Sequence, residues 1–276
     1  MIGPRVGLAI GPRVGPAVSL DADPIFSGGG GVNPMAGVDQ DGASAKYVPA
    51  NGAQWTQTMA VAGIGSGNPT DWWLCQEAAG NLASSGAGIT LAANGTPLYQ
   101  QAVSGWSRLG VGFTNAANQR FTAAAGIAPN PATTSVLFLW YMAITAAPGA
   151  QVVMGNVSDG ATNYRVMAQV VGSTKIQNAC AGVVVNGTTD ATTVGIQPVV
   201  IQYDRTNSVA NVYTLNDKIV GTYNASVVDG RKGIGGATSP TGQAVYGALW
   251  SGAGAEMSAA QIKTLLQTLN WSPTWS

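Results

Sequence analysis

The chain contains few residues that could perform acid–base chemistry, and their spacing is unfavourable. Its only glutamates are Glu77 and Glu256, and neither is followed by an aspartate two residues later. Glycoside hydrolysis needs two carboxyl groups that face the scissile bond across a defined gap. The aspartates instead occur among residues that are typical of turns. Examples are Asp159, Asp190, Asp204, Asp217 and Asp229. This pattern favours a role in turns over a catalytic carboxylate pair.

The sequence also lacks the residue patterns that nucleophilic catalysis and metal binding usually need. The sequence has no histidine, which excludes Ser-His-Asp, Cys-His and histidine-ligated metal sites. Two isolated cysteines, Cys75 and Cys180, do not make a metal motif. We expect them to be buried free thiols, with a disulfide as the alternative. The sequence therefore predicts a protein that is not an enzyme and that holds no metal or cofactor.

Composition narrows the classes of partner. Charged residues make up 9% of the 276 residues, and 12 basic residues balance 12 acidic ones. Without a basic excess, nucleic-acid binding lacks its electrostatic driving force. The longest strongly apolar run, residues 136–144, is far shorter than the ~20 residues that span a bilayer. We expect neither nucleic acid nor a membrane as partner. The scarcity of charge suits a chain that packs against other subunits.

The first 31 residues carry a short repeat. IGPRVG occurs at 2–7 and again at 10–15. Recurrent proline forbids a helix and favours an extended arm, and it also interrupts any signal peptide. The arm has apolar side chains that find no partner within it, so we predict that it docks on another subunit, with a disordered tail as the alternative. The predicted partner-binding residues are Ile2, Arg5, Val6, Ile10, Arg13 and Val14.

Two glycine-rich segments suggest the domain boundaries. Gly28–Gly31 ends the arm, and a second glycine-rich hinge covers residues 63–69. We expect residues 32–66 to form a linker or small subdomain, with a short helix from Ala53 to Val61. Residues 67–276 then form one β-domain, because runs rich in Val, Ile, Phe and Tyr alternate there with turn residues.

Within this β-domain, residues 134–144 are apolar on both faces, which is typical of a central strand. Asn216 and Asp217 indicate a hairpin turn. Near the C-terminus, Ser258 and Gln261 have the spacing of a capping box, which begins a helix with one apolar stripe. This helix is expected to lie against the sandwich.

The tryptophans indicate packing more than ligand stacking. Trp140 and Trp250 lie in predicted strands and are expected in the core. The adjacent Trp72 and Trp73 must point to opposite faces of a strand. Trp271 and Trp275 follow the last helix, where we expect them to hold the C-terminal tail against the sheet.

The order of segments from about residue 70 to 271 resembles the concanavalin A-like, laminin-G-type jelly roll. The resemblance rests on the motifs DWWL at 71–74, GNL at 80–82, QRF at 119–121, VVMGN at 152–156 and YRV at 164–166, and on the closing strand and capped helix. It implies an all-β jelly-roll sandwich with a C-terminal helix. Such modules often hold one calcium ion at the rim, for which Asp159 and Asp204 are candidates, although turn capping is the preferred interpretation.

Members of this superfold include lectins, glycosidases, adhesion modules and accessory domains of virion proteins, so the fold does not settle the function. The arm, the low charge and the missing catalytic inventory favour a virion structural protein: a bacteriophage capsid decoration, cement or head-fibre subunit. It would sit on the capsid surface, contact the major capsid protein or other virion subunits, and form a homo-oligomer. The alternative is a carbohydrate-binding adhesin or tail-fibre module that binds a surface glycan; a third is an intracellular interaction module.

Overall fold

The structure is a computed structural model that describes residues 33–114, 119–124, 126–146, 152–157, 166–170, 173–235 and 241–276. The chain divides into two compact units, Met1–Ala36 and Gly37–Ser276. The predicted arm, with Ile2, Arg5, Val6, Ile10, Arg13 and Val14, lies outside the described residues. The structure places residues 37–66, expected as a linker or small subdomain, in the same unit as the sandwich. This second unit contains every described strand and helix.

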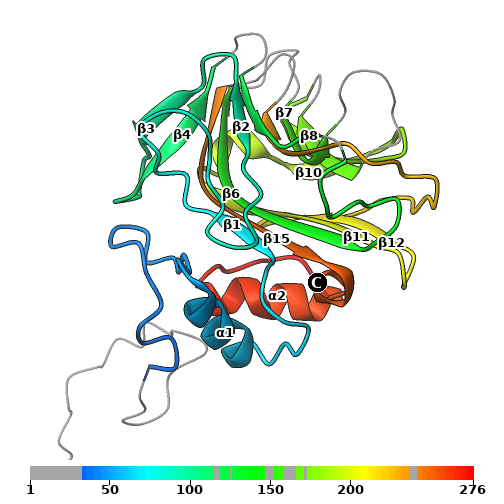
Figure 1. The fold of residues 1–276 in the computed structure, drawn as a ribbon, viewed down its shortest axis with the longest axis horizontal. Coiled ribbons are helices and arrows are strands. Elements are labelled where there is room, and N and C mark those ends of the chain that lie inside the picture. The colour runs from blue at the N-terminus through cyan, green and yellow to red at the C-terminus, as the bar shows by residue number, and fades with distance from the viewer. Residues whose placement is uncertain are drawn as a thin grey trace, which may run out of the picture. The chain divides into compact units, whose positions relative to one another are not determined.

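One sheet of the second unit has eight antiparallel strands (Figure 1). In order across the sheet, it contains β13 (Lys218–Val220), β12 (Val209–Tyr213), β11 (Gln197–Asp204), β6 (Val136–Ala146), β15 (Thr241–Ser251), β4 (Leu109–Phe113) and β3 (Leu98–Ala102), while β1 (Asp71–Trp73) also pairs with β15. The long strands β6 and β15 are neighbours at its centre, and for β6 this central position was predicted from its two-sided apolar pattern. Gly247 on β15 pairs with Trp140 on β6, where a Cβ atom would come within 2.3 Å of the indole ring.

The second sheet has seven antiparallel strands. Their order is β10 (Val183–Asp190), β9 (Lys175–Cys180), β8 (Val166–Val170), β7 (Val152–Val157), β14 (Arg231–Gly235), β5 (Arg120–Thr122) and β2 (Ala92–Asn94). The main core lies between the sheets, and the rings of Trp73 and Trp140 stack there with centroids 5.5 Å apart. The all-β sandwich predicted from the sequence is confirmed.

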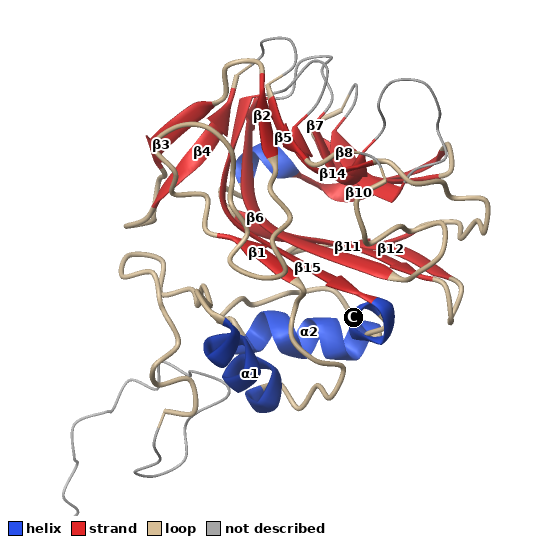
Figure 2. Cartoon of the chain, viewed as in Figure 1, coloured by secondary structure: helices blue, strands red, loops and turns tan. Residues whose placement is uncertain are grey.

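Helices cover the other face of the eight-stranded sheet (Figure 2). These are α1 (Gly52–Val61) and α2 (Ala259–Thr268), while η1 (Ala191–Thr193) and η2 (Gly252–Ala255) are short 3-10 turns. The predicted capping box is confirmed, because Ser258 and Gln261 bond reciprocally at the start of α2. No helix in the described part of the chain has the length and hydropathy needed to cross a membrane.

Aromatic rings fill the space between this sheet and the helices. Trp250 on β15 meets Trp55 of α1 edge-on, with centroids 5.2 Å apart, and Tyr141 on β6 meets Trp271 at 5.0 Å. Trp275 donates a hydrogen bond of 2.8 Å to the Thr214 carbonyl, so the C-terminal tail is held against the sheet as expected. As also expected, Cys75 and Cys180 are buried free thiols.

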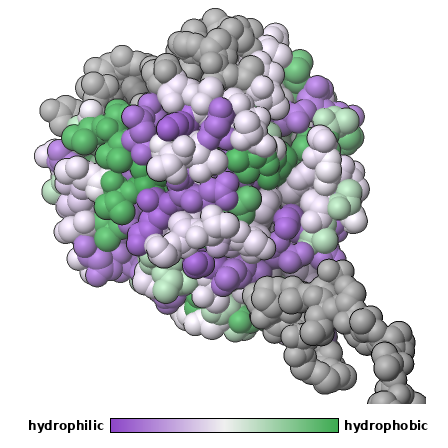
Figure 3. Space-filling model, turned by 180° about the vertical axis from the view of Figure 1, so that it is seen from behind, coloured by the Kyte–Doolittle hydropathy of each residue, from purple (hydrophilic) through white to green (hydrophobic). Residues whose placement is uncertain are grey.

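Large apolar side chains also reach the surface. Of the described residues, those that are more than a third exposed are Leu98, Leu109, Ile127, Val183, Val184, Val220 and Val228. Val183 and Val184 lie on β10 and Val220 on β13, each the edge strand of its sheet. Figure 3 shows apolar areas separated by polar ones on the face seen from behind. Sheet edges with apolar side chains are surfaces at which other chains can pair.

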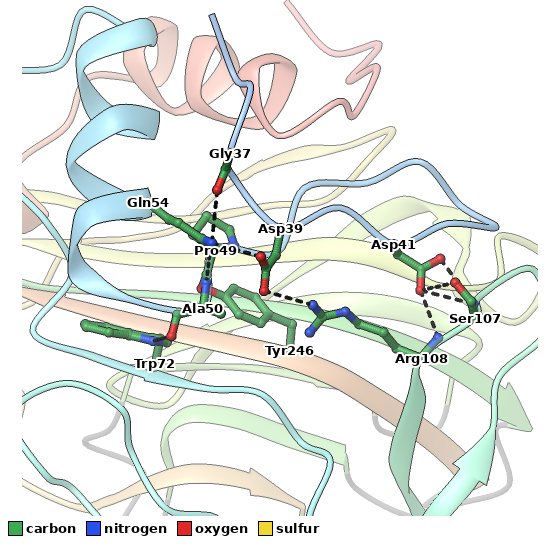
Figure 4. A network of polar contacts seen from close by, with 10 residues as sticks. All are labelled: Gly37, Asp39, Asp41, Pro49, Ala50, Gln54, Trp72, Ser107, Arg108 and Tyr246. Carbon is green, nitrogen blue, oxygen red and sulfur yellow. Dashed lines mark hydrogen bonds and ion pairs between the residues drawn. The ribbon is translucent and has the colours of Figure 1, made fainter.

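The segment before α1 is fastened to the sheet by polar contacts (Figure 4). Tyr246 donates a hydrogen bond of 2.7 Å to the Pro49 carbonyl, and Trp72 donates one of 3.1 Å to the Ala50 carbonyl. Asp41 is buried and accepts hydrogen bonds from the backbone N–H groups of Ser107 and Arg108 at 3.0 and 2.8 Å. Burial raises the pKa of Asp41, but these and other hydrogen bonds outweigh that effect and lower the pKa from 3.8 to about 2.

We expect Asp41→Asn to lower the free energy of unfolding at pH 7 by about 2 kcal/mol, because a pKa that falls from 3.8 to about 2 on folding stabilises the ionised state. This contribution is complete above pH 3.8 and is lost as the pH falls through about 2. Urea unfolding of both proteins between pH 7 and pH 2 should show the difference shrinking towards acid. The exposed Asp39→Asn is the control, with an expected change below about 0.5 kcal/mol. A difference that is constant with pH would contradict this role.

Candidate functional site

A polar cavity opens where the eight-stranded sheet meets the start of α2. Its volume is about 370 Å³. Strands β11, β12 and β13 supply one side, and the chain from Glu256 to Gln261 supplies the other. The lining residues are Gln202, Asp204, Asn207, Val209, Asn211, Tyr213, Lys218, Glu256, Met257, Ser258, Ala259 and Gln261. Most of these side chains can donate or accept hydrogen bonds.

A chain of hydrogen bonds fixes the buried part of the cavity. The Asn211 amide donates to the Tyr213 hydroxyl at 3.0 Å, and that hydroxyl donates to Oε1 of Gln202, also at 3.0 Å. The Gln202 amide in turn donates to the Met257 carbonyl at 2.5 Å. Burial raises the pKa of Tyr213, and the nearby charge of Asp204 adds to this effect. The tyrosine therefore stays protonated and keeps its hydrogen at neutral pH.

Two carboxylates line the same cavity, each held by its own partners. Asp204 accepts hydrogen bonds from the backbone N–H and the side-chain amide of Asn207, at 2.9 and 2.7 Å. Glu256 accepts from the hydroxyls of Ser135 and Thr206, at 2.9 and 2.6 Å, through one of its two oxygens. Fixed carboxylate, amide and hydroxyl groups around one hollow suit the binding of a ligand rich in hydroxyl groups.

Of the aspartates singled out in the sequence, Asp190 and Asp204 cap local turns, whereas Asp217 and Asp229 also bond to segments far along the chain. Asp190 accepts from the Thr192 backbone at the start of η1. Asp217 accepts from the backbone N–H groups of Thr188 and Thr189 on the edge strand β10. Asp159, the other calcium candidate beside Asp204, lies outside the described residues. Among the described residues, no three acidic or cysteine side chains gather into a group that could hold a metal ion.

Sequence reasoning did not find this cavity. It singled out Asp204 and Glu256 separately, but Gln202, Asn211 and Tyr213 carry no motif. The two sides of the cavity are at least 38 residues apart in the chain, from Lys218 to Glu256, and only the packing of α2 brings them together. Alternation along β12 could have placed Asn211 and Tyr213 on one face, but not opposite a helix start.

Comparisons with known proteins give a fold and no family. No protein-family model matches the chain, and no curated protein does. A Trypanosoma rangeli sialidase structure with 2,3-difluorosialic acid matches with a TM-score of 0.54 at 10% identity, covering 77% of this chain and 37% of that chain. The same sialidase with sialic acid gives a TM-score of 0.53 at 11% identity, covering 78% and 36%.

A third structure concerns botulinum neurotoxin type C, whose cell entry is described as dependent on interaction with two ganglioside molecules. It matches with a TM-score of 0.49 at 9% identity, covering 73% of this chain and 51% of that chain. The chain spans little more than a third of the length of the sialidases. At such identities the sialidase matches show a shared β-sandwich fold alone.

The prediction that the protein is not an enzyme is contradicted by the sialidase matches, because the same fold occurs within structures of an enzyme. The prediction excluded activity from missing histidines and missing paired glutamates. Glycosidases do not all need either, since sialidases use a tyrosine nucleophile. The exclusion therefore used too narrow an inventory of catalytic groups. The matches in turn assign no activity to this chain.

We expect Tyr213→Phe to lower the free energy of unfolding by about 1–2 kcal/mol, because it leaves Gln202 and Asn211 without their shared hydroxyl partner in a buried place. Urea unfolding with the midpoint and slope fitted for each protein measures this change. The control is Tyr99→Phe, whose hydroxyl meets the Gly80 carbonyl at a more exposed place and should cost less. An equal decrease in the free energy of unfolding of both variants would show that the buried chain of hydrogen bonds contributes no more to stability than the exposed one.

Proposed function

We propose that this protein is a structural subunit of a virion, a capsid decoration, cement or head-fibre subunit that docks through its N-terminal arm. The observation that carries the proposal is the division of the chain at Ala36, which separates the IGPRVG repeats from a unit that contains every described strand and helix. All residues of the core cluster between the sheets belong to the second unit, and in this proposal the arm serves another subunit. The partner is the major capsid protein or a neighbouring virion subunit.

The surface of the sandwich is in keeping with this role. Few charges are present in the whole chain, and apolar side chains stand exposed on the edge strands β10 and β13. Surfaces with few charges resist association poorly. A subunit that lives within an assembly, including a homo-oligomer, meets other protein at such surfaces. In this proposal the sandwich lies on the capsid surface while the arm follows the capsid subunits.

Deletion of residues 1–31 should abolish co-sedimentation of the chain with particles of the virus that encodes it. The double variant Arg5→Ala and Arg13→Ala should weaken binding by about tenfold or more, because each repeat loses the cation that fixes its register. Circular dichroism and the unfolding midpoint should stay unchanged. Lys175→Ala with Lys218→Ala is a control that removes two cations from the sandwich. Undiminished particle binding of the deleted chain would exclude docking by the arm.

A second candidate function is carbohydrate binding, favoured by the cavity between β11, β12, β13 and α2. Its carboxylate, amide and hydroxyl groups suit a polyhydroxylated ligand. The sialidase structures that share the fold are described in complex with sialic acid and a derivative of it, which supports the class of ligand without placing it here. A virion subunit that displays such a cavity would attach to a surface glycan, so the two functions are compatible.

Glycan-array binding of the full chain, followed by calorimetry with the best sugar, tests this candidate. Asn211→Ala should weaken binding by about three- to tenfold, because it removes one hydrogen-bonding side chain from the cavity wall. The control Gln243→Ala removes an amide from the same sheet outside the cavity lining. No binding on the array, or equal binding by both variants, would remove the cavity as a glycan site.

A further inference from the structure

A second polar site lies on the seven-stranded sheet, on the face turned away from the core. Phe121 of β5 and Ile234 of β14 pair with each other, and both are fully buried in the core between the sheets. Side chains alternate between the faces of a strand. The neighbours of Phe121, which are Arg120 and Thr122, therefore point to the outer face of this sheet.

The register places a third residue on the same face. Arg120 pairs with Gly235 and Thr122 pairs with Gly233, so the next residue of β14 on this face is Arg231. Gly233 must be glycine because a Cβ atom there would lie 2.0 Å from the Phe121 carbonyl oxygen. On this face Thr122 has Arg120 and Arg231 as neighbours. The two glycines leave bare backbone on β14, while β2 places Ala92 opposite Thr122.

The two guanidinium groups have no acidic partner in the described part of the chain, where the ion pairs are those of Arg108 with Asp39 and Lys232 with Asp229. Asp229 is the acid nearest to Arg231 in the sequence, and it binds Lys232 and the Gly126 backbone instead. Burial lowers the pKa of Arg120, and the positive charge of Arg231 lowers it further. Within the described residues, two like charges thus act on each other without compensation.

Two polar atoms at the same place lack a hydrogen bond within the described residues. Nε of Arg120 and Oγ1 of Thr122 are both buried and have no partner there, and Thr122 is only 3% exposed. An unsatisfied buried polar group costs about 1–3 kcal/mol. Water could solvate the charges of the two half-exposed arginines, but it would not supply the missing hydrogen bond of the buried Thr122 hydroxyl. An acceptor with several lone pairs would satisfy all three side chains.

We propose that Arg120, Thr122 and Arg231 form a binding site for an oxyanion, the carboxylate or sulfate group of a ligand. Guanidinium groups bind such groups through paired N–H donors, and the threonine hydroxyl adds a third donor. The arginines are half-buried, so each keeps part of its surface in solvent while its charge is poorly screened. The site lies on a different sheet from the cavity, and it is independent of both proposed functions.

The test is a titration of the full chain with sodium sulfate, sodium glucuronate and glucose, followed by NMR of the arginine Nε–H groups at low salt. Sulfate or glucuronate should produce a saturable shift of the Arg120 signal, and glucose should not. Arg231→Gln should weaken binding by about tenfold, and the isosteric Thr122→Val by about threefold or more. Lys175→Gln, which removes a cation on β9, three strands away from β14 and outside the cavity, should leave binding unchanged.

Thr122→Val also gives a readout that does not depend on binding. Without anion, it should be at least as stable as the parent chain, because it replaces an unpartnered hydroxyl by a methyl group. Added sulfate should raise the unfolding midpoint of the parent more than that of this variant. Binding of glucuronate as well as sulfate would identify a site that accepts carboxylates, and sulfate alone a tetrahedral oxyanion. The absence of saturable binding, or equal binding by the parent, Arg231→Gln and Thr122→Val, would overturn the proposal.

Discussion

The structure depends on the burial of both faces of the central strands β6 and β15. On β6, Phe138 and Trp140 face the core between the sheets, while Leu139 and Tyr141 face the helices, and all four are at most 1% exposed. Burial of apolar surface contributes about 25 cal/mol per Å², and large aromatic side chains contribute most of that area. A two-layer sandwich would leave one face of these strands in water. A third layer is therefore required.

That third layer is assembled from distant parts of the chain. Helix α1 comes before all the described strands, and helix α2 and the C-terminal tail come after them. Their aromatic rings fill the gap, and hydrogen bonds from Tyr246, Trp72 and Trp275 to backbone carbonyls fix their positions. Segments that look peripheral in the sequence thus belong to the same compact unit as the sheets, Gly37–Ser276.

The two proposed ligand sites differ in how the fold creates them. The cavity arises at the margin of the third layer, where the start of α2 stands off from β11 and β12 and polar side chains line the gap. The arginine site arises on the opposite sheet, from strand alternation and from two glycines that leave bare backbone on β14. In a chain with so few charges, two neighbouring arginines without an acid among the described residues are a costly arrangement that a bound anion would relieve.

The sequence by itself determined the local features whose causes are local. The capping box at Ser258, the two-sided strand around Trp140 and the opposite directions of Trp72 and Trp73 follow from spacing alone. Tertiary structure decided which distant segments meet, because contacts between strands depend on pairing order and register, which periodicity does not encode. For this reason neither the cavity around Tyr213 nor the pairing of Thr122 with Gly233 could be predicted from the sequence. The exclusion of enzymatic activity failed for another reason, because its inventory of catalytic groups left out the tyrosine nucleophile that sialidases use.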